Sequence, residues 1–167
     1  MEQRQPLAGF MERPSTSNAR WFMGSLLNFL ATGRQTGAQF SVFEAKVRRG
    51  EEVPPHTHSR EDETFYVLEG EMACTVGDNT YHAKVGDLVF LPRDVQHTWK
   101  ALTEPTRFLV WINPAGLEEV FLACSEPAPV MELPPVAAGP DDALTARVVA
   151  MDNQYGVVYA FQTEAPQ

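Results

Sequence analysis

The sequence has very little cysteine, only Cys74 and Cys124 among 167 residues. Two cysteines cannot form the disulfide framework of a small secreted domain, and their spacing does not match a zinc site built from thiolates. A disulfide-stabilised secreted fold is therefore excluded. We expect both cysteines to be small core residues of a reduced, cytoplasmic protein.

Basic residues and long apolar runs are also scarce. The chain has 13 lysines and arginines against 22 acidic residues, which gives a net charge of -9 at pH 7. Such a chain repels nucleic-acid phosphates and anionic lipid headgroups. The apolar stretch Trp21–Ala31 is far shorter than the ~20 residues that span a bilayer. Neither nucleic acid nor a membrane is expected as a partner.

Short apolar segments separated by turn residues make up most of the chain. They predict strands at 21–30, 39–47, 56–58, 63–69, 71–76, 80–83, 87–91, 97–101 and 107–113. A turn is expected at 32–37. Many short strands at nearly even spacing favour an all-β sandwich or barrel of the jelly-roll type. The length suits one domain with a substantial core.

The two ends of the chain differ from this pattern. Residues 1–20 predict a loose N-terminal arm, residues 21–113 the barrel, and residues 114–167 a C-terminal part packed on the same domain. In that last part Leu117, Val120, Phe121 and Cys124 repeat at helical spacing. A proline-rich linker follows over 126–135, then a second short helix from 140 to 151 that Gly156 would end, and a last strand over 157–161.

Three of the four histidines fall in one stretch together with a carboxylate. His56 and His58 project from the same side of an extended strand, because side chains alternate between its faces. Glu63 opens the next apolar run, and His97 follows a later turn. This mixed nitrogen and oxygen set suits one divalent transition metal ion: iron, manganese, nickel, copper or zinc.

These residues resemble the cupin family. Its first motif, Gly-x5-His-x-His-x4-Glu-x6-Gly, is met in full, and its second, Gly-x5-Pro-x-Gly-x2-His-x3-Asn, is met except at Asp94 and Ala101. Asp94 replaces a glycine, and Asp is among the few residues that tolerate a positive φ. The resemblance implies a double-stranded β-helix with four metal ligands. The motif positions are Gly50, His56, His58, Glu63, Gly70, Gly86, Pro92 and His97.

A substrate pocket is expected beside these ligands. Phe65 and Val67 share a strand face with Glu63, and Trp99 shares one with His97. Phe90 and Trp111 are further candidates, although the sequence does not fix which way they point. For any one of these side chains, ordinary core packing is the preferred explanation. His82 is expected on the surface and 60–62 in a solvated turn, with Asp62 as an alternative ligand.

The resemblance implies activity like that of bacterial quercetin dioxygenase-like proteins. A metal-dependent dioxygenase would act on a small phenolic or enolisable compound, and Glu63 would take up its proton. Two alternatives stay open: a metal-dependent isomerase or decarboxylase, and a cupin that binds a small ligand without chemistry. One barrel hosts many activities, so the fold does not choose among them. The apolar N-terminal strand, with its exposed edge, also predicts a homodimer.

Overall fold

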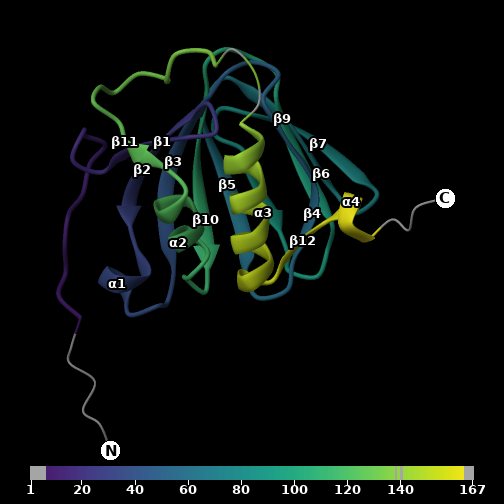
Figure 1. The fold of residues 1–167 in the computed structure, drawn as a ribbon, viewed down its shortest axis with the longest axis horizontal. Helices are drawn as coiled ribbons and strands as arrows, with labels where there is room; N and C mark the ends of the chain where they lie inside the picture. Colours follow the sequence, from purple (N-terminus) through teal and green to yellow (C-terminus); the bar gives the residue numbers. More distant parts are fainter. Residues whose placement is uncertain (1–6, 138, 140, 164–167) are drawn as a thin grey trace, which may run out of the picture.

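Two antiparallel sheets face each other in this computed structural model, which describes residues 7–137, 139 and 141–163 (Figure 1). The start of the predicted arm (1–6), residues 138 and 140, and the end of the C-terminal part (164–167) lie outside the described residues. The architecture is the all-β jelly roll that the strand pattern predicts. Strands form because β-branched and aromatic residues alternate with polar ones along most segments.

The elements are as follows in chain order. The strands are β1 Ala19–Phe22, β2 Ser25–Ala31, β3 Ser41–Val47, β4 Glu52–His58, β5 Asp62–Glu69, β6 Glu71–Val76, β7 Asn79–Lys84, β8 Leu88–Leu91, β9 His97–Ala101, β10 Thr106–Asn113, β11 Glu126–Pro127 and β12 Val157–Tyr159. The helices are α1 Gly33–Thr36, α2 Glu118–Ala123, α3 Asp142–Tyr155 and α4 Ala160–Thr163.

The order of strands brings distant segments together. Within the described part of the chain, one sheet has the order β11-β1-β2-β3-β10-β5-β8 and the other β12-β4-β9-β6-β7. β4 and β9 are neighbours in the second sheet, while β5 belongs to the first. The strand that carries His56 and His58 therefore pairs with the strand that carries His97, and Glu63 reaches them from the opposite sheet.

The core lies between the two sheets and follows the two-residue alternation of strands. On β10, Phe108, Val110 and Ile112 are buried, while Trp111 between them is exposed. Both predicted core cysteines are buried and free. Apolar side chains from facing strands thus fill the interior, and every second residue is left for the outer surface.

The N-terminal strands differ from the sequence-based expectation. One strand was expected over 21–30, but β1 and β2 form a hairpin that turns at Met23 and Gly24, both with positive φ. The expected turn at 32–37 contains the short helix α1. Its start is stabilised by Gln35, whose Oε1 accepts a hydrogen bond from the Thr32 backbone N–H at 2.9 Å. The hydrogen bonds between Thr32 and Gln35 therefore favour a short helix where the glycines alone predict a simple turn.

The C-terminal part covers one end of the barrel. Both predicted helices are present as α2 and α3, and Gly156 ends α3 in a left-handed conformation. Asp141 caps α3, because its carboxylate accepts a hydrogen bond from the Leu144 N–H at 2.8 Å. Figure 1 shows α3 lying between the strands of the two sheets. The predicted last strand is shorter than expected: β12 pairs with β4 and gives way to α4.

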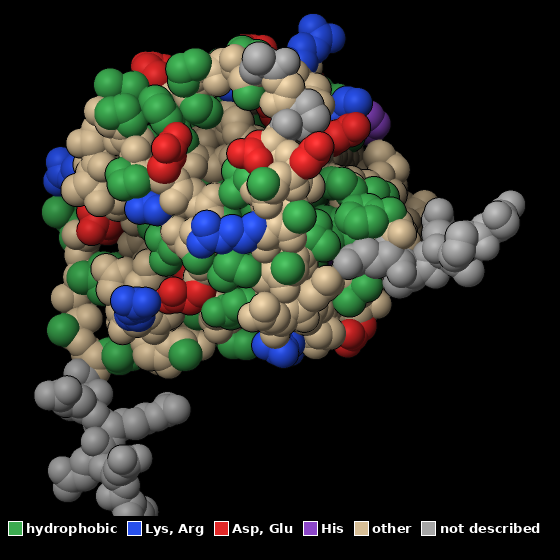
Figure 2. Space-filling view, in the orientation of Figure 1, with side chains coloured by type: hydrophobic (Ala, Val, Ile, Leu, Met, Phe, Trp, Pro, Cys, Tyr) green, Lys and Arg blue, Asp and Glu red, His purple; other side chains and the backbone are tan. Residues whose placement is uncertain are grey.

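On the face that carries α3, acidic, basic and hydrophobic side chains are intermingled, without one large basic area (Figure 2). His82 is exposed, as expected. Among the described helices, none is long and apolar enough to cross a membrane.

Candidate metal centre

β4 presents two histidines to the interior. The strand alternates so that His56 and His58 are buried, 6% and 2% exposed, while Thr57 between them is only half-buried. Pro54 and Pro55 precede this pair. Their rings fix φ, which restricts the backbone just before the histidines. Both imidazoles therefore enter the barrel from the same strand face.

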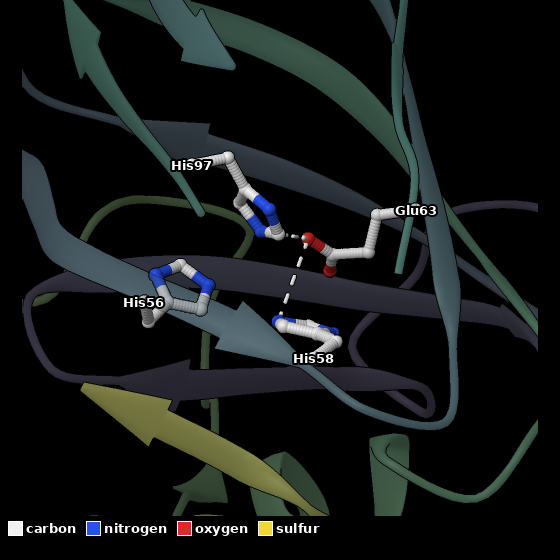
Figure 3. A group of neighbouring side chains, drawn as sticks. All are labelled: His56, His58, Glu63 and His97. Atoms are coloured by element: carbon white, nitrogen blue, oxygen red, sulfur yellow. Dashed lines mark ion pairs between the residues drawn. The ribbon is translucent and has the colours of Figure 1, made fainter. Parts of the chain in front are cut away.

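β9 and β5 complete the cluster. His97 lies directly opposite His56 on the neighbouring strand, and Glu63 comes from the facing sheet. One donor atom from each of the four residues lies within 4.8 Å of every other. Figure 3 shows the four side chains turned toward a common space. The structure thus brings together all four ligands that the motifs predict, in a cluster compatible with a divalent metal ion.

The turn before His97 depends on Asp94. Its φ is +63°, the left-handed conformation predicted from its place in the motif. Its backbone N–H donates a hydrogen bond to the His58 carbonyl oxygen at 2.7 Å. This bond ties the turn to β4, so the conformation of one residue helps to set how His97 approaches His58.

Backbone carbonyls fix the orientation of two imidazoles. His56 Nδ1 lies 2.9 Å from the Pro54 oxygen, and His97 Nδ1 lies 3.0 Å from the Val95 oxygen. A carbonyl oxygen only accepts, so each Nδ1 carries the proton and each Nε2 keeps its lone pair. The lone pairs needed for metal binding are therefore set by the backbone, as is usual for histidine ligands.

The polar atoms at the centre are poorly satisfied by one another. Glu63 Oε2 lies 3.5 Å from His97 Nε2 and 3.9 Å from His58 Nε2, too far for good hydrogen bonds (Figure 3). Among the described residues, buried His97 Nε2 has no hydrogen-bond partner. Unmet buried acceptors are costly in an apolar interior. A cation bound between them would satisfy them, and the residues present fit such an ion.

Burial also sets the protonation states. It lowers the pKa of His56 to about 4, helped by His97 and His58, and it lowers the pKa of His58 as well. Burial disfavours charge on Glu63, but the surrounding imidazoles hold the pKa of this carboxyl below its ordinary value. At neutral pH, His56 and His58 are neutral and Glu63 is ionised, as metal binding requires.

A cavity of about 290 Å³ opens beside the cluster. Phe65 and Trp99, expected in the pocket, line it, together with Phe43, Phe108 and Phe121. None of the described residues that line it is a lysine or arginine. The volume is near the lower end of pockets that hold drug-sized ligands, roughly 300–1,000 Å³. The cavity therefore suits a small, largely apolar molecule.

Three of the five predicted pocket residues do not line this cavity. Val67 is buried in the core away from it. Phe90 and Trp111 are exposed by 53% and 46%, because strand alternation on β8 and β10 turns them to the outer surface. The reasons differ: the sequence does not fix which way Phe90 and Trp111 point, whereas Val67 shares the buried face of Glu63 and Phe65, as predicted, but lies two residues beyond Phe65 on β5.

The turn after His58 is not fully solvated as predicted. Glu61 is only 3% exposed, and its burial raises its pKa to about 7. Asp62 forms an ion pair with Arg93 at 2.7 Å and is not part of the cluster, so the alternative ligand is not used. This ion pair joins the start of β5 to the turn that precedes His97.

Sequence reasoning missed one polar pair in the cavity wall. The Tyr159 hydroxyl donates a hydrogen bond to Asp152 Oδ2 at 2.7 Å, and the ring centroids of Tyr159 and His56 are 5.5 Å apart. Burial raises the pKa of Asp152 to about 6, although the bond from Tyr159 opposes the shift. The only sequence signal was the expected strand over 157–161, whose partner strand the sequence does not reveal.

Fold and site together define a class of protein: a jelly-roll barrel with three imidazoles and one carboxylate buried inside it. Residues 43–112 match the model of the Cupin domain family. This match contains all four cluster residues and excludes α2, α3 and β12. The part of the chain that matches a cupin domain is thus residues 43–112, less than half of its length.

Known proteins resemble this chain in sequence or in fold. The chain is 26% identical over 102 residues to quercetin 2,3-dioxygenase of Bacillus subtilis, a match that covers 61% of this chain and 30% of that enzyme. The fold resembles an RmlC-like cupin from Shewanella frigidimarina, with a TM-score of 0.52, 22% identity and coverage of 69% and 96%. It also resembles oxalate decarboxylase from Bacillus subtilis, with a TM-score of 0.55, 19% identity and coverage of 66% and 31%.

Proposed function

We propose that this protein is a metal-dependent dioxygenase that acts on a small phenolic or enolisable compound. The observation that supports this is the position of the buried His56, His58, Glu63 and His97 cluster, which opens onto an apolar, aromatic-lined cavity. Similarity to quercetin 2,3-dioxygenase supports the same reaction class, although the chain spans less than a third of that enzyme.

The four cluster residues would hold one divalent ion through three imidazole nitrogens and one carboxylate oxygen. When bound, such an ion acts as a Lewis acid toward a substrate oxygen and gives access to oxygen chemistry. The Pro54 and Val95 carbonyls keep His56 and His97 in the tautomer that binds. The protein thus supplies a prepared set of ligands, which limits the entropy lost when the ion binds.

Glu63 is the proposed base. It is ionised at neutral pH and is the only anion of the cluster, so it is suited to accept the proton of a phenol or enol at its carboxylate oxygen. The aromatic walls around Phe65 and Trp99 exclude water from that proton transfer and hold a flat ring by dispersion contacts. The chain therefore binds, orients and deprotonates the substrate.

The cavity chemistry opposes strongly anionic substrates. Glu51, Glu52 and Asp152 line it in addition to Glu63, and the described lining has no basic side chain to offset a second negative charge. A bound divalent ion would attract one anionic group, but a second anionic group held away from the ion would face Glu51, Glu52 or Asp152 without a lysine or arginine to neutralise it. This favours the phenolic substrate over the decarboxylase or isomerase alternatives, which would have to act on neutral molecules here.

The test combines metal analysis with oxygen dependence. Purified protein is assayed for bound iron, manganese, nickel, copper and zinc, and then incubated with quercetin, simple phenols and 1,3-dicarbonyl compounds with and without air. The proposal predicts substrate loss with stoichiometric oxygen uptake in air only. Equal turnover without oxygen would identify the isomerase or decarboxylase, and tight binding without turnover would identify a non-catalytic cupin.

We also propose that the protein forms a homodimer and is cytoplasmic. The apolar side chains of Tyr66, Leu88, Phe90 and Trp111 are exposed on adjacent strands β5, β8 and β10, which supports a second copy covering this outer face. A monomeric mass by light scattering, unchanged in Phe90→Glu, would contradict this.

The free, buried cysteines support a reducing compartment such as the cytoplasm.

A further inference from the structure

The C-terminal strand extends the sheet that carries the histidines. β12 pairs with β4 so that Val157 lies opposite His58 and Tyr159 opposite His56. Paired residues on neighbouring antiparallel strands share a face, so Tyr159 points into the barrel beside the cluster. This strand lies outside residues 43–112, the part that matches the family model. Tyr159 therefore lies beside the cluster but outside the part of the chain that matches the family model.

Helix α3 adds a carboxylate at the same place. Asp152 is 5% exposed and Tyr159 8%, and both line the cavity that the metal cluster opens onto. Their hydrogen bond of 2.7 Å joins α3 to β12 within the cavity wall. The pair thus belongs to the part of the cavity wall that α3 and β12 build, together with Thr145, Val148, Val149 and Val157.

The chemistry of the pair restricts what it can bind. The Tyr159 hydroxyl uses its proton on Asp152, so the pair offers a ligand oxygen acceptors rather than donors. Among the described residues, Tyr159 makes the only side-chain hydrogen bond to the Asp152 carboxylate, which leaves its second oxygen as an acceptor. The absence of lysine and arginine from the described lining removes any basic partner. The pair therefore suits a hydroxyl group and repels a carboxylate.

We propose that Asp152 and Tyr159 form a specificity-determining subsite that accepts a hydrogen bond from a hydroxyl of the substrate, while another substrate oxygen lies at the metal cluster. The inference rests on the proposed function, because it assumes an oxygen-bearing ligand at the metal. It goes further by naming the substrate class: a small, neutral ring compound with a metal-binding enol or phenol oxygen and a second, separate hydroxyl.

Three hydroxypyranones that differ at one position test this preference. Kojic acid, allomaltol and comenic acid share the metal-binding enol and ketone oxygens and carry a hydroxymethyl, methyl or carboxylate group at the same ring carbon. Their dissociation constants for zinc-loaded full-length protein are measured by calorimetry at pH 7.5, with the zinc content verified after each titration. Zinc has no redox chemistry, so binding is measured apart from turnover.

The wild-type protein is expected to bind kojic acid about tenfold more tightly than allomaltol, the scale of one hydrogen bond to a charged acceptor. Comenic acid is expected to bind most weakly. In Tyr159→Phe and Asp152→Asn the ratio between kojic acid and allomaltol falls toward one, and Asp152→Asn also binds comenic acid more tightly than wild type does. The ratio is the diagnostic quantity, because a merely structural role would weaken all three ligands alike.

Matched controls come from the same helix. Tyr155→Phe removes a hydroxyl that does not line the cavity, and Asp142→Asn neutralises an exposed carboxylate of the first turn. Both should keep the wild-type ratio. Equal binding of kojic acid and allomaltol by wild type would overturn this inference alone. If the zinc protein binds neither compound, both the proposed oxygen ligand at the metal and the subsite fail.

Discussion

Two regions meet at the cavity, and they differ in how their polar groups are satisfied. In the metal cluster, His97 Nε2 has no hydrogen-bond partner among the described residues, and Glu63 lies 3.5 Å away. In the C-terminal wall, Asp152 and Tyr159 satisfy one another at 2.7 Å. In the first region a buried acceptor lacks a partner until an ion binds. In the second region the two side chains already form a hydrogen bond with each other. Metal removal should therefore disturb the cluster much more than the wall.

The largest effect is expected from removing one ligand of the cluster. His97→Ala should lower metal affinity by more than about 100-fold, since loss of a residue that only supports a ligand already costs about 10–100-fold. Metal titration with a competing chelator measures this. Added metal should restore part of any activity, and Tyr159→Phe should retain the ion. Equal metal affinity in His97→Ala and wild type would remove His97 from the site.

Glu63→Gln separates charge from shape within the same region. Glutamine keeps the size and one oxygen donor but has no basicity, so turnover should fall by about 10²-fold or more while the fold and some metal remain. Steady-state rates on the substrate found in the oxygen-dependence assay, with metal content measured in parallel, provide the test. Unchanged turnover at equal metal content would exclude Glu63 as the base.

The wall is tested through pH. The folded pKa of Asp152, about 6, lies above its ordinary value of 3.8, so the folded state binds this proton more tightly than the unfolded state. Ionised Asp152 therefore lowers the free energy of unfolding above pH 6, and this loss disappears as the pH falls from 6 toward 3.8. Relative to wild type, metal-free Asp152→Asn should gain up to about 3 kcal/mol between pH 4 and pH 7.5.

Urea denaturation of both metal-free proteins at the two pH values measures this difference. The change in this stability difference between the two pH values cancels every effect of the substitution that does not depend on pH. If variant and wild type differ in stability by the same amount at pH 4 and pH 7.5, then burial does not raise the pKa of Asp152.

The smallest effect is expected at the turn between β8 and β9, just before His97. Asp94 has a φ of +63°, which costs an ordinary L-residue roughly 1–2 kcal/mol and Asp less. Asp94→Gly should be neutral or stabilising by up to about 1 kcal/mol, and Asp94→Ala should be destabilising because alanine keeps the β-carbon but lacks the polar side chain that lets Asp tolerate a positive φ. Midpoints of urea denaturation rank the three proteins. A clear loss of stability in Asp94→Gly would assign a stabilising contact to its carboxylate.

Local signals predicted the elements that are defined by neighbours in sequence. Strand alternation identified most of the barrel, and Asp141 and Gly156 marked the ends of α3. The β1–β2 hairpin and α1 were missed, because a reversal at Met23 and a capping contact of Gln35 have weak signatures beside strong apolar and glycine patterns. Phe90 and Trp111 were misplaced because parity along one strand says nothing about which face meets another sheet.

The sequence by itself determined which four residues form the candidate metal site. His56, His58, Glu63 and His97 stand at fixed spacings within one stretch, and strand periodicity together with the motif glycines directs them inward. Only the tertiary structure decided what faces that cluster. β12 pairs with β4, and α3 packs across the barrel end, through contacts between residues far apart in the chain. Such pairing depends on the total burial and hydrogen bonding of the folded chain, so no local pattern places Asp152 and Tyr159 beside His56.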